Sequence, residues 1–311
     1  MTASNNRPVL VTGSHRSGST WVGRMLALSP SLAYIHEPFN PYHRPGICKA
    51  RFPYWFTHVC DENEAAYLTG LQDCLRFRYH FAEELKSIRS VKDSLRLSRD
   101  FYRFSKYRLL GKRPLVKDPI AIFSAEWLAQ RFHMDVIVLI RHPAAFAGSL
   151  KKAQWTHPFD HFVRQPLLMR HHLGRYRSDI ETFSTTDHDI VGQAILLWNV
   201  IHHMILQYRD MHPEWIFAKH EELSQHPIEQ FRRIYDSIGL HFSPRIQRII
   251  TQHSFADPTT GDSDPLRRDS RSNVRQWHTR LTPAEIDRIR EHTHQIAEEF
   301  YTDADWLDQA P

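Results

Sequence analysis

The chain has 311 residues, of which 41% are hydrophobic and 24% are charged. These proportions are typical of a soluble globular protein and exclude a disordered chain, and the length suits one large α/β domain. The formal net charge of +5 suits an anionic ligand but is too small to indicate nucleic-acid binding on its own.

The cysteines and the N-terminal residues indicate the cellular compartment in which we expect the protein. The cysteines Cys48, Cys60 and Cys74 are odd in number and show no C-x-x-C spacing, so we expect free thiols in a reducing compartment. The polar start of the chain leaves no room for a signal peptide, and no apolar run approaches the ~20 residues that cross a membrane. We expect a cytoplasmic protein without a transmembrane segment.

Residues 8–28, PVLVTGSHRSGSTWVGRMLAL, are predicted to form a strand, a glycine-led polar loop and a helix. An apolar run precedes Gly13, and apolar residues recur at helical spacing from Trp21. In such an arrangement the backbone N–H groups of the loop and the N-terminus of the helix converge on a phosphate.

This loop departs from the nucleoside-triphosphatase pattern at one position. Residues 13–20 fit G-x-x-x-x-G-K-[ST] except at Ser19, which stands where the lysine belongs. That lysine reaches the β- and γ-phosphates of a triphosphate, whereas the cation of this loop is Arg16. The loop is therefore predicted to bind an anion other than a Mg-triphosphate.

A second strand is predicted over residues 31–39, with Glu37 at its C-terminal end because Pro38 cannot donate to the sheet. Ligands of open α/β sheets bind at that edge. Residues 40–113 follow with poor periodicity and many aromatic and basic side chains, and one or two helices are expected between 64 and 107. This segment is either an insertion that covers the substrate or a plain helical cap, and the sequence favours neither.

Another predicted strand ends in a basic residue that is followed by a helix. The continuous apolar run 135–141 is typical of a strand buried on both faces of a parallel sheet. It ends in Arg141, and Pro143 begins a helix that carries Ser149. This separation can bring a guanidinium and a hydroxyl together around one phosphate.

The remaining segments are predicted to be mainly helical. Loops with one short helix are expected over 154–186, and a helix with a capping box over 281–301. Residues 257–273 are predicted to form a loop, whose nearby arginines are either a solvated basic face or a flap over a doubly phosphorylated ligand. Strands are also expected at 113–119 and 215–219, and helices at 121–132, 189–212, 227–238 and 244–253.

Two pairs of adjacent histidines, His171 with His172 and His202 with His203, invite comparison with zinc sites. Adjacent residues face different ways on a helix, and no His–Glu set at helical i, i+4 spacing accompanies them. The sequence therefore predicts no metal site.

Three motifs in order along the chain, HRSGSTW, LIRHPAAFAGSL and RQWHTRLTPAEIDRI, resemble those of the sulfotransferases that use 3′-phosphoadenosine 5′-phosphosulfate (PAPS). FAKHEELSQHP is similar to the family's strand and acidic turn, with His220 in place of the usual Tyr. The likeness is closer to bacterial and carbohydrate-type members than to cytosolic aryl types. It implies an α/β three-layer P-loop-like fold, in which helices flank a central parallel β-sheet. It also implies a single domain over 1–311, with an insertion at about 40–113 and a C-terminal cofactor flap at about 257–281.

The resemblance also implies a binding site for the sulfuryl donor. Arg16 would hold the sulfuryl and 5′-phosphate oxygens, while Arg141 and Ser149 would bind the 3′-phosphate. Further loop residues would supply hydrogen-bond donors or an aromatic ring near the nucleotide, and a C-terminal arginine would close the site: Ser17, Gly18, Ser19, Thr20, Trp21 and Arg275.

Sulfuryl transfer to a hydroxyl needs a base for the acceptor proton and cations for the developing charge. By the resemblance, Glu37 is the base and Lys117 contacts the sulfuryl or leaving oxygen. Pro119 stands where cytosolic relatives carry a catalytic histidine, which is why the base role moves to Glu37. Glu37 could instead form a plain buried ion pair with Arg16 or another arginine, and the competing bases are His36, His43 and Asp118. No divalent metal is needed in this scheme.

Two other classes of function stay open. One is a P-loop kinase that uses Mg-ATP, against which the missing loop lysine argues, and the other is a non-catalytic module that binds polyanions. For the sulfotransferase, the acceptor is a hydroxyl of a carbohydrate or of a small molecule such as a secondary metabolite, and the sequence does not decide between them. Nucleic acid is not an expected partner, and the helices permit a dimer without locating its interface.

Overall fold

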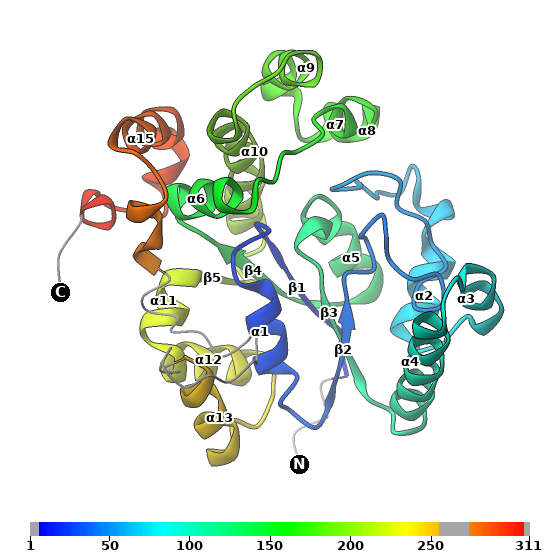
Figure 1. Cartoon of the computed structure of the whole chain (residues 1–311). Coiled ribbons are helices and arrows are strands. Elements are labelled where there is room, and N and C mark those ends of the chain that lie inside the picture. The colour runs from blue at the N-terminus through cyan, green and yellow to red at the C-terminus, as the bar shows by residue number, and fades with distance from the viewer. Residues whose placement is uncertain (1–5, 255–273, 308–311) are drawn as a thin grey trace.

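A computed structural model describes residues 6–254 and 274–307 and shows a central sheet with helices on both faces (Figure 1). The sheet has the strand order β2-β3-β1-β4-β5, and every neighbouring pair is parallel. This confirms the predicted α/β fold with a parallel sheet. The strands are β1 (Val9–Gly13), β2 (Leu32–His36), β3 (Arg113–Lys117), β4 (Asp135–Ile140) and β5 (Ile216–Lys219).

Alternate side chains of the central strand serve two separate hydrophobic cores, because successive residues of a strand point to opposite faces. Val9 and Val11 pack on one face and Leu10 on the other, and all three are fully buried. The helices of the first face are α1 (Ser19–Leu26), α12 (Pro227–Ser237) and α13 (Pro244–Ser254). Those of the second face include α6 (Pro143–Ala153), α10 (Ile190–Met211) and α15 (Pro283–Ala297).

The long helix α10 lies against the sheet and is capped at its start by Asp189, whose carboxylate accepts from the Gly192 N–H at 2.5 Å. By length and composition alone this helix could cross a membrane, which the sequence analysis did not recognise. In the structure 67% of its apolar window is buried inside the protein, and Trp198 has no exposed surface. That burial is typical of the core helix of a soluble fold.

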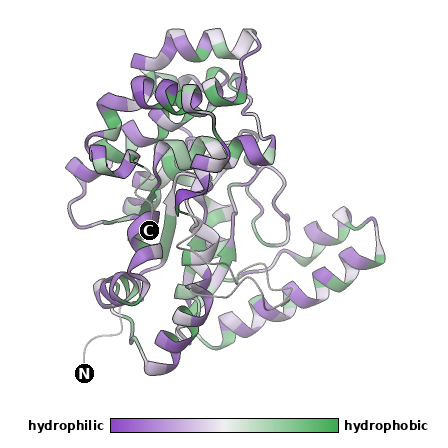
Figure 2. Ribbon diagram, turned by 60° about the vertical axis from the view of Figure 1, so that its left-hand side comes forward, coloured by the Kyte–Doolittle hydropathy of each residue, from purple (hydrophilic) through white to green (hydrophobic). Residues whose placement is uncertain are grey.

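Between β2 and β3 the chain leaves the sheet and forms a helical insertion at one side of the molecule (Figure 1). It contains three α-helices, where one or two were predicted. Figure 2 shows its helices, like the other outer ones, striped in purple and green, as expected of amphipathic helices. The elements are η1 (Glu64–Ala66), α2 (Leu68–Leu75), α3 (Phe81–Ser87) and α4 (Val91–Leu109).

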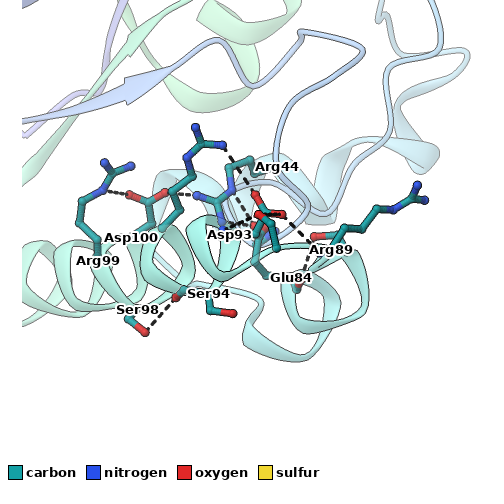
Figure 3. Close-up of polar contacts among 12 residues, drawn as sticks. Arg44, Glu84, Arg89, Asp93, Ser94, Ser98, Arg99 and Asp100 are labelled. Carbon is teal, nitrogen blue, oxygen red and sulfur yellow. Dashed lines mark hydrogen bonds and ion pairs between the residues drawn. The ribbon is translucent and has the colours of Figure 1, made fainter.

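Arg44 ties this insertion together from inside (Figure 3). Its guanidinium pairs with the carboxylates of Glu84 on α3 and of Asp100 on α4, the latter at 2.7 Å. Glu84 also accepts from the backbone N–H of Gly46 at 2.8 Å. The charge of Arg44 is therefore neutralised within the fold, since both carboxylates are buried.

The prediction of loops with one short helix over 154–186 is wrong, since several helices form there. They lack a clear hydrophobic period because they are short and present mainly polar faces. These elements are α7 (Asp160–Val163), α8 (Pro166–His171), η3 (Gly174–Tyr176) and α9 (Arg177–Thr185). The helix predicted over 121–132 is observed as η2 (Pro119–Ser124) followed by α5 (Ala125–Phe132). The sequence analysis missed α11 (His220–Gln225).

The C-terminal elements are η4 (Gln276–Thr279), α15 and η5 (Asp303–Trp306). The predicted capping box of α15 is confirmed, because Thr282 and Glu285 exchange hydrogen bonds. Most of the predicted flap lies outside the described residues, and the arginines Arg267, Arg268 and Arg271 lie outside them too.

Candidate active site

The loop between β1 and α1 lies at the C-terminal edge of the sheet, and its backbone requires glycine. Gly18 has φ of 82° and precedes the first turn of α1. A Cβ atom there would lie 2.6 Å from Nδ1 of His220 on α11, so a side chain does not fit. The N-terminus of α1 thus has no side-chain cap and presents its N–H groups to the edge of the sheet, where an anion can bind.

Three segments converge at this loop. The Nε of Arg16 donates to the Ser149 hydroxyl of α6 at 2.9 Å. The Arg141 guanidinium, just after β4, donates to the carbonyl of Arg16. The sequence predicted that Arg141 and Ser149 would lie together. In the structure, Arg16 contacts Ser149, whereas Arg141 contacts the backbone of the loop.

Arg141 is a buried cation whose Nε has no hydrogen-bond partner in the described part of the chain. Burial lowers its pKa to about 10, and the nearby charges of Arg16 and Arg280 act in the same direction. The group therefore stays cationic at neutral pH. A buried guanidinium with an unused donor suits an anionic ligand.

A hydrogen-bonded layer supports the backbone next to Arg141. The Glu221 carboxylate accepts from the His142 N–H at 3.1 Å and from the Tyr301 hydroxyl at 3.0 Å. Sequence analysis gave no role to His220, Glu221 or Tyr301, although the acidic-turn motif around His220 was the signal that could have identified the first two.

Glu37 and Lys117 form an ion pair at the ends of the neighbouring strands β2 and β3. Lys117 is 1% exposed, and the Glu37 side chain is 21% exposed. Burial disfavours the Glu37 carboxylate, but Lys117, together with the Asn40 amide at 3.0 Å, outweighs it and lowers the pKa. The carboxylate is thus ionised at neutral pH, and its partner is a lysine rather than the arginine considered above.

The competing bases have other partners. The Asp118 carboxyl accepts from the Phe39 N–H at 2.7 Å, and burial raises its pKa to about 8, so it is mainly protonated at pH 7. Both ring nitrogens of His43 contact backbone carbonyls, at 2.7 and 2.9 Å. The His36 ring lies 4.0 Å from Glu37 and is largely exposed, and desolvation lowers its pKa.

A small pocket lies beside the loop and is lined mainly by rings. Burial lowers the pKa of His15 to about 3, and its Nδ1 has no partner among the described residues. Nε2 of His157 is likewise without a partner there. The lining residues are His15, Trp55, Phe56, Ile120, Leu150, Trp155, Thr156, His157 and Leu197.

The other residues predicted to bind the donor lie in or near the same loop or in the C-terminal segment. Ser17 donates its hydroxyl to the Ser14 carbonyl within the loop, and Trp21 packs edge-on against Phe231 at 5.2 Å. Ser19 and Thr20 begin α1. Arg275 precedes η4.

C-terminal residues cover the start of α6 beside Arg141. A Cβ atom on Gly148 would lie 3.3 Å from Trp277, and Trp277 stacks on His142 at 5.3 Å. Arg280 follows in the same segment, and its charge lowers the pKa of Arg141. Sequence analysis did not select Arg280, although it stands in the quoted C-terminal motif.

Residues 8–181, more than half of the chain, match the sequence model of the sulfotransferase family. The chain belongs to this family. The match confirms the predicted resemblance and supports sulfotransferase activity. It includes the loop between β1 and α1, Glu37, Lys117 and Arg141.

Solved structures agree with this membership at the level of fold. The sulfotransferase domain from the Synechococcus PCC 7002 olefin synthase has a TM-score of 0.50 and 17% identity, over 97% of this chain and 98% of that one. The sulfotransferase domain from the curacin biosynthetic pathway follows with 0.48 and 16%, over 93% and 97% of the two chains. A mouse sulfotransferase complexed with PAP gives 0.47 and 10%, over 98% and 89%. The fold comparison rests on the first of these, and no curated protein matches the chain.

Proposed function

We propose that this sulfotransferase transfers a sulfuryl group from PAPS to a hydroxyl of a carbohydrate or small-molecule acceptor. The observation that carries the proposal is the convergence of Arg16, Arg141 and Ser149 at the uncapped N-terminus of α1. Two cations and a helix N-terminus suit a donor with an anionic group on either side of its ribose. The unused Nε of Arg141 suits such a ligand.

The donor supplies an activated sulfuryl group when it is bound. Arg16 and the N–H groups that open α1 would hold the 5′-phosphosulfate, and Arg141 with Ser149 would hold the 3′-phosphate. A triphosphate would lack its loop lysine here, because position 19 is Ser. The missing lysine therefore favours PAPS over Mg-ATP.

Glu37 would take the acceptor proton. The acceptor oxygen bonds to sulfur as the bond from sulfur to the 5′-phosphate oxygen breaks, and the proton moves to the Glu37 carboxylate. Its lowered pKa keeps this carboxylate ionised and ready to accept. Lys117, which pairs with Glu37, would lie close enough to offset negative charge on the oxygens of the transferring group.

The uncharged lining of the small pocket favours an uncharged acceptor over an acidic one. Its only titratable side chains are His15 and His157, and burial lowers the pKa of both, so they are neutral. Arg44, a cation that could have served an acidic glycan, is paired with Glu84 and Asp100 instead. The unpartnered His15 Nδ1 and His157 Nε2 could hydrogen-bond an uncharged hydroxyl.

The reaction is proposed to take place in the reducing cytoplasm. All three cysteines are free thiols, which suits that compartment.

The test is calorimetric titration of the protein with 3′-phosphoadenosine 5′-phosphate, with AMP and Mg-ATP as competitors. We expect the bisphosphate to bind tightest and Arg141→Ala to weaken it at least tenfold, because a charge-assisted contact is worth roughly 1.5–3 kcal/mol. Arg164→Ala is the matched control, since Arg164 is the first residue after α7 and its side chain is exposed. Preference for Mg-ATP, or equal binding by the two variants, would refute the proposal.

A further inference from the structure

Three metal-ligating side chains meet at a point outside the donor loop and the ring-lined pocket. The ligand atoms of His58, Cys60 and His171 all lie within 4.8 Å of one another. His58 and Cys60 belong to the insertion, and His171 is the last residue of α8. The proposed sulfuryl transfer uses none of them.

The hydrogen bonds of the two imidazoles direct ring nitrogens toward each other. Nδ1 of His58 lies 2.6 Å from the Phe123 carbonyl and must donate to it, so Nε2 of His58 carries a lone pair. That Nε2 lies 3.2 Å from Nδ1 of His171. At most one proton can lie between the two nitrogens, and a metal ion that binds both lone pairs can replace it.

The other nitrogen of His171 has two neighbours, a Glu62 carboxylate oxygen at 3.1 Å and the Arg170 guanidinium at 3.2 Å. Donation to Glu62 leaves the lone pair on Nδ1, facing His58. This is the carboxylate–histidine arrangement that orients imidazole ligands of zinc.

The distances suit a tetrahedral ion. Zinc–nitrogen bonds of about 2.0–2.1 Å place two ligand nitrogens about 3.3 Å apart, and the observed separation is 3.2 Å. A zinc–sulfur bond of about 2.3 Å places sulfur about 3.6 Å from each nitrogen. Since the Cys60 sulfur already lies within 4.8 Å, it needs to approach by about 1 Å.

The loop that carries two of the ligands is already fixed in place. Asn63 accepts from the Cys60 N–H and donates to the His58 carbonyl, both at 2.9 Å. Gln165 accepts from the His58 N–H at 2.8 Å. The site is also reachable from solvent, because the His171 side chain is 29% exposed and Cys60 is half-buried.

We propose that His58, Cys60 and His171 bind a zinc ion whose fourth ligand is water. Two imidazoles and a thiolate select zinc over magnesium or calcium, which prefer oxygen. On binding, the Cys60 thiol releases its proton to solvent, whereas His171 keeps its single ring proton on Nε2, toward Glu62. The ion joins the insertion to α8. This inference does not depend on the proposed function and departs from the sequence prediction of no metal.

The experiment uses the full chain, stripped with a chelator and titrated with zinc in a calorimeter. We expect one saturable site, which Cys60→Ser and His171→Gln each weaken at least tenfold. His203→Gln, which removes a partly exposed histidine on α10 outside the cluster, is the matched control and should bind zinc like the wild type. His58 is left unchanged because it is buried.

Two further measurements identify the ligands. With cobalt in place of zinc, a sulfur-to-cobalt charge-transfer band should appear in the wild type and be absent from Cys60→Ser. Cys60 is the one cysteine that is not buried, so zinc should slow its reaction with a thiol reagent.

The proposal is refuted if zinc binds the wild type no more tightly than the double variant Cys60→Ser/His171→Gln, or if the cobalt band survives in Cys60→Ser. If the metal-free variants unfold at the same urea concentration as the metal-free wild type, a folding defect does not explain the loss of zinc binding. Binding of 3′-phosphoadenosine 5′-phosphate, measured on the same samples, should not change. Failure of the zinc site and failure of the donor site are therefore distinguishable.

Discussion

Glu37 and Asp118 are carboxyl groups near Lys117, and their surroundings move their pKa values in opposite directions. Burial raises both, but the Lys117 ammonium and Asn40 reverse the effect at Glu37. At Asp118 burial prevails, and the nearby charge of Glu37 adds to it. One carboxyl is therefore ionised at pH 7 and can accept a proton, whereas the other is mainly protonated and holds the Phe39 backbone.

This difference predicts unequal results for two isosteric amide substitutions. Glu37→Gln should lower kcat on the order of a hundredfold or more, since it removes the proposed general base. Asp118→Asn should leave kcat within a few-fold, because it replaces one neutral acceptor of the Phe39 N–H by another. Steady-state rates measure kcat, and titration with 3′-phosphoadenosine 5′-phosphate verifies an intact donor site. An active Glu37→Gln variant would assign Glu37 to a plain ion pair with Lys117.

Among the elements, the turn from β1 into α1 depends on a glycine for two separable reasons. Gly18 has a positive φ, which disfavours any residue with a Cβ atom, and the His220 ring occupies the place of that atom. Gly111, after α4, also has a positive φ of 55°, but nothing lies within 4 Å of its Cβ position. A comparison of substitutions at Gly18 and Gly111 therefore distinguishes the cost of backbone strain from the cost of steric overlap.

Gly111→Ala should cost roughly 1–2 kcal/mol of unfolding free energy, from φ alone, and leave donor binding unchanged. Gly18→Ala should cost more and weaken donor binding at least tenfold, because the loop or His220 must move. Urea unfolding and calorimetric titration measure the two effects. Equal losses of stability and full donor binding in both variants would show that His220 does not constrain the loop.

The sequence predicted the elements whose hydrophobic period is strong and missed those held by tertiary contacts. The run that forms β4 and the periodic helix α10 were predicted almost to the residue. The short helices α7 to α9 were missed because packing on α10 and on the insertion, rather than their own pattern, stabilises them.

The same limit applies to the sites. Arg16, Glu37 and Arg141 stand in local motifs or at strand ends, so a single sequence pointed to them. The partner of His171 is His58, 113 residues away in the chain, rather than the adjacent His172. No pattern of spacing reveals such a pair, because the fold alone brings its members together.

The molecule as a whole holds many of its histidines as neutral imidazoles in its interior. Burial lowers the pKa values of His15, His142, His202 and His220 to about 3. In the unfolded chain these groups take up protons below about pH 6.5. Protonation therefore favours the unfolded state. The free energy of unfolding decreases as pH falls from 6.5 toward 3, because these rings stay neutral in the folded protein.

Each such histidine should lower the free energy of unfolding by about 1.4 kcal/mol per pH unit below 6.5. Asp118 and Glu221, whose pKa values burial raises, act in the opposite sense, but the neutral histidines outnumber them. Urea midpoints should thus fall steeply between pH 7 and 5. His202→Gln should reduce this slope and exposed His241→Gln should not. A midpoint that stays constant over this range would contradict the prediction.

The layer that supports Arg141 has a consequence for the newly made chain. The backbone beside Arg141 is held by Glu221, and Glu221 in turn by Tyr301, near the C-terminal end. Since a ribosome adds roughly 5–20 residues per second, the loop between β1 and α1 emerges many seconds before Tyr301. A nascent chain can pair its first strands long before it can hold Arg141 in place. A ligand that requires Arg141 to be held in place can therefore bind only after Tyr301 has been synthesised.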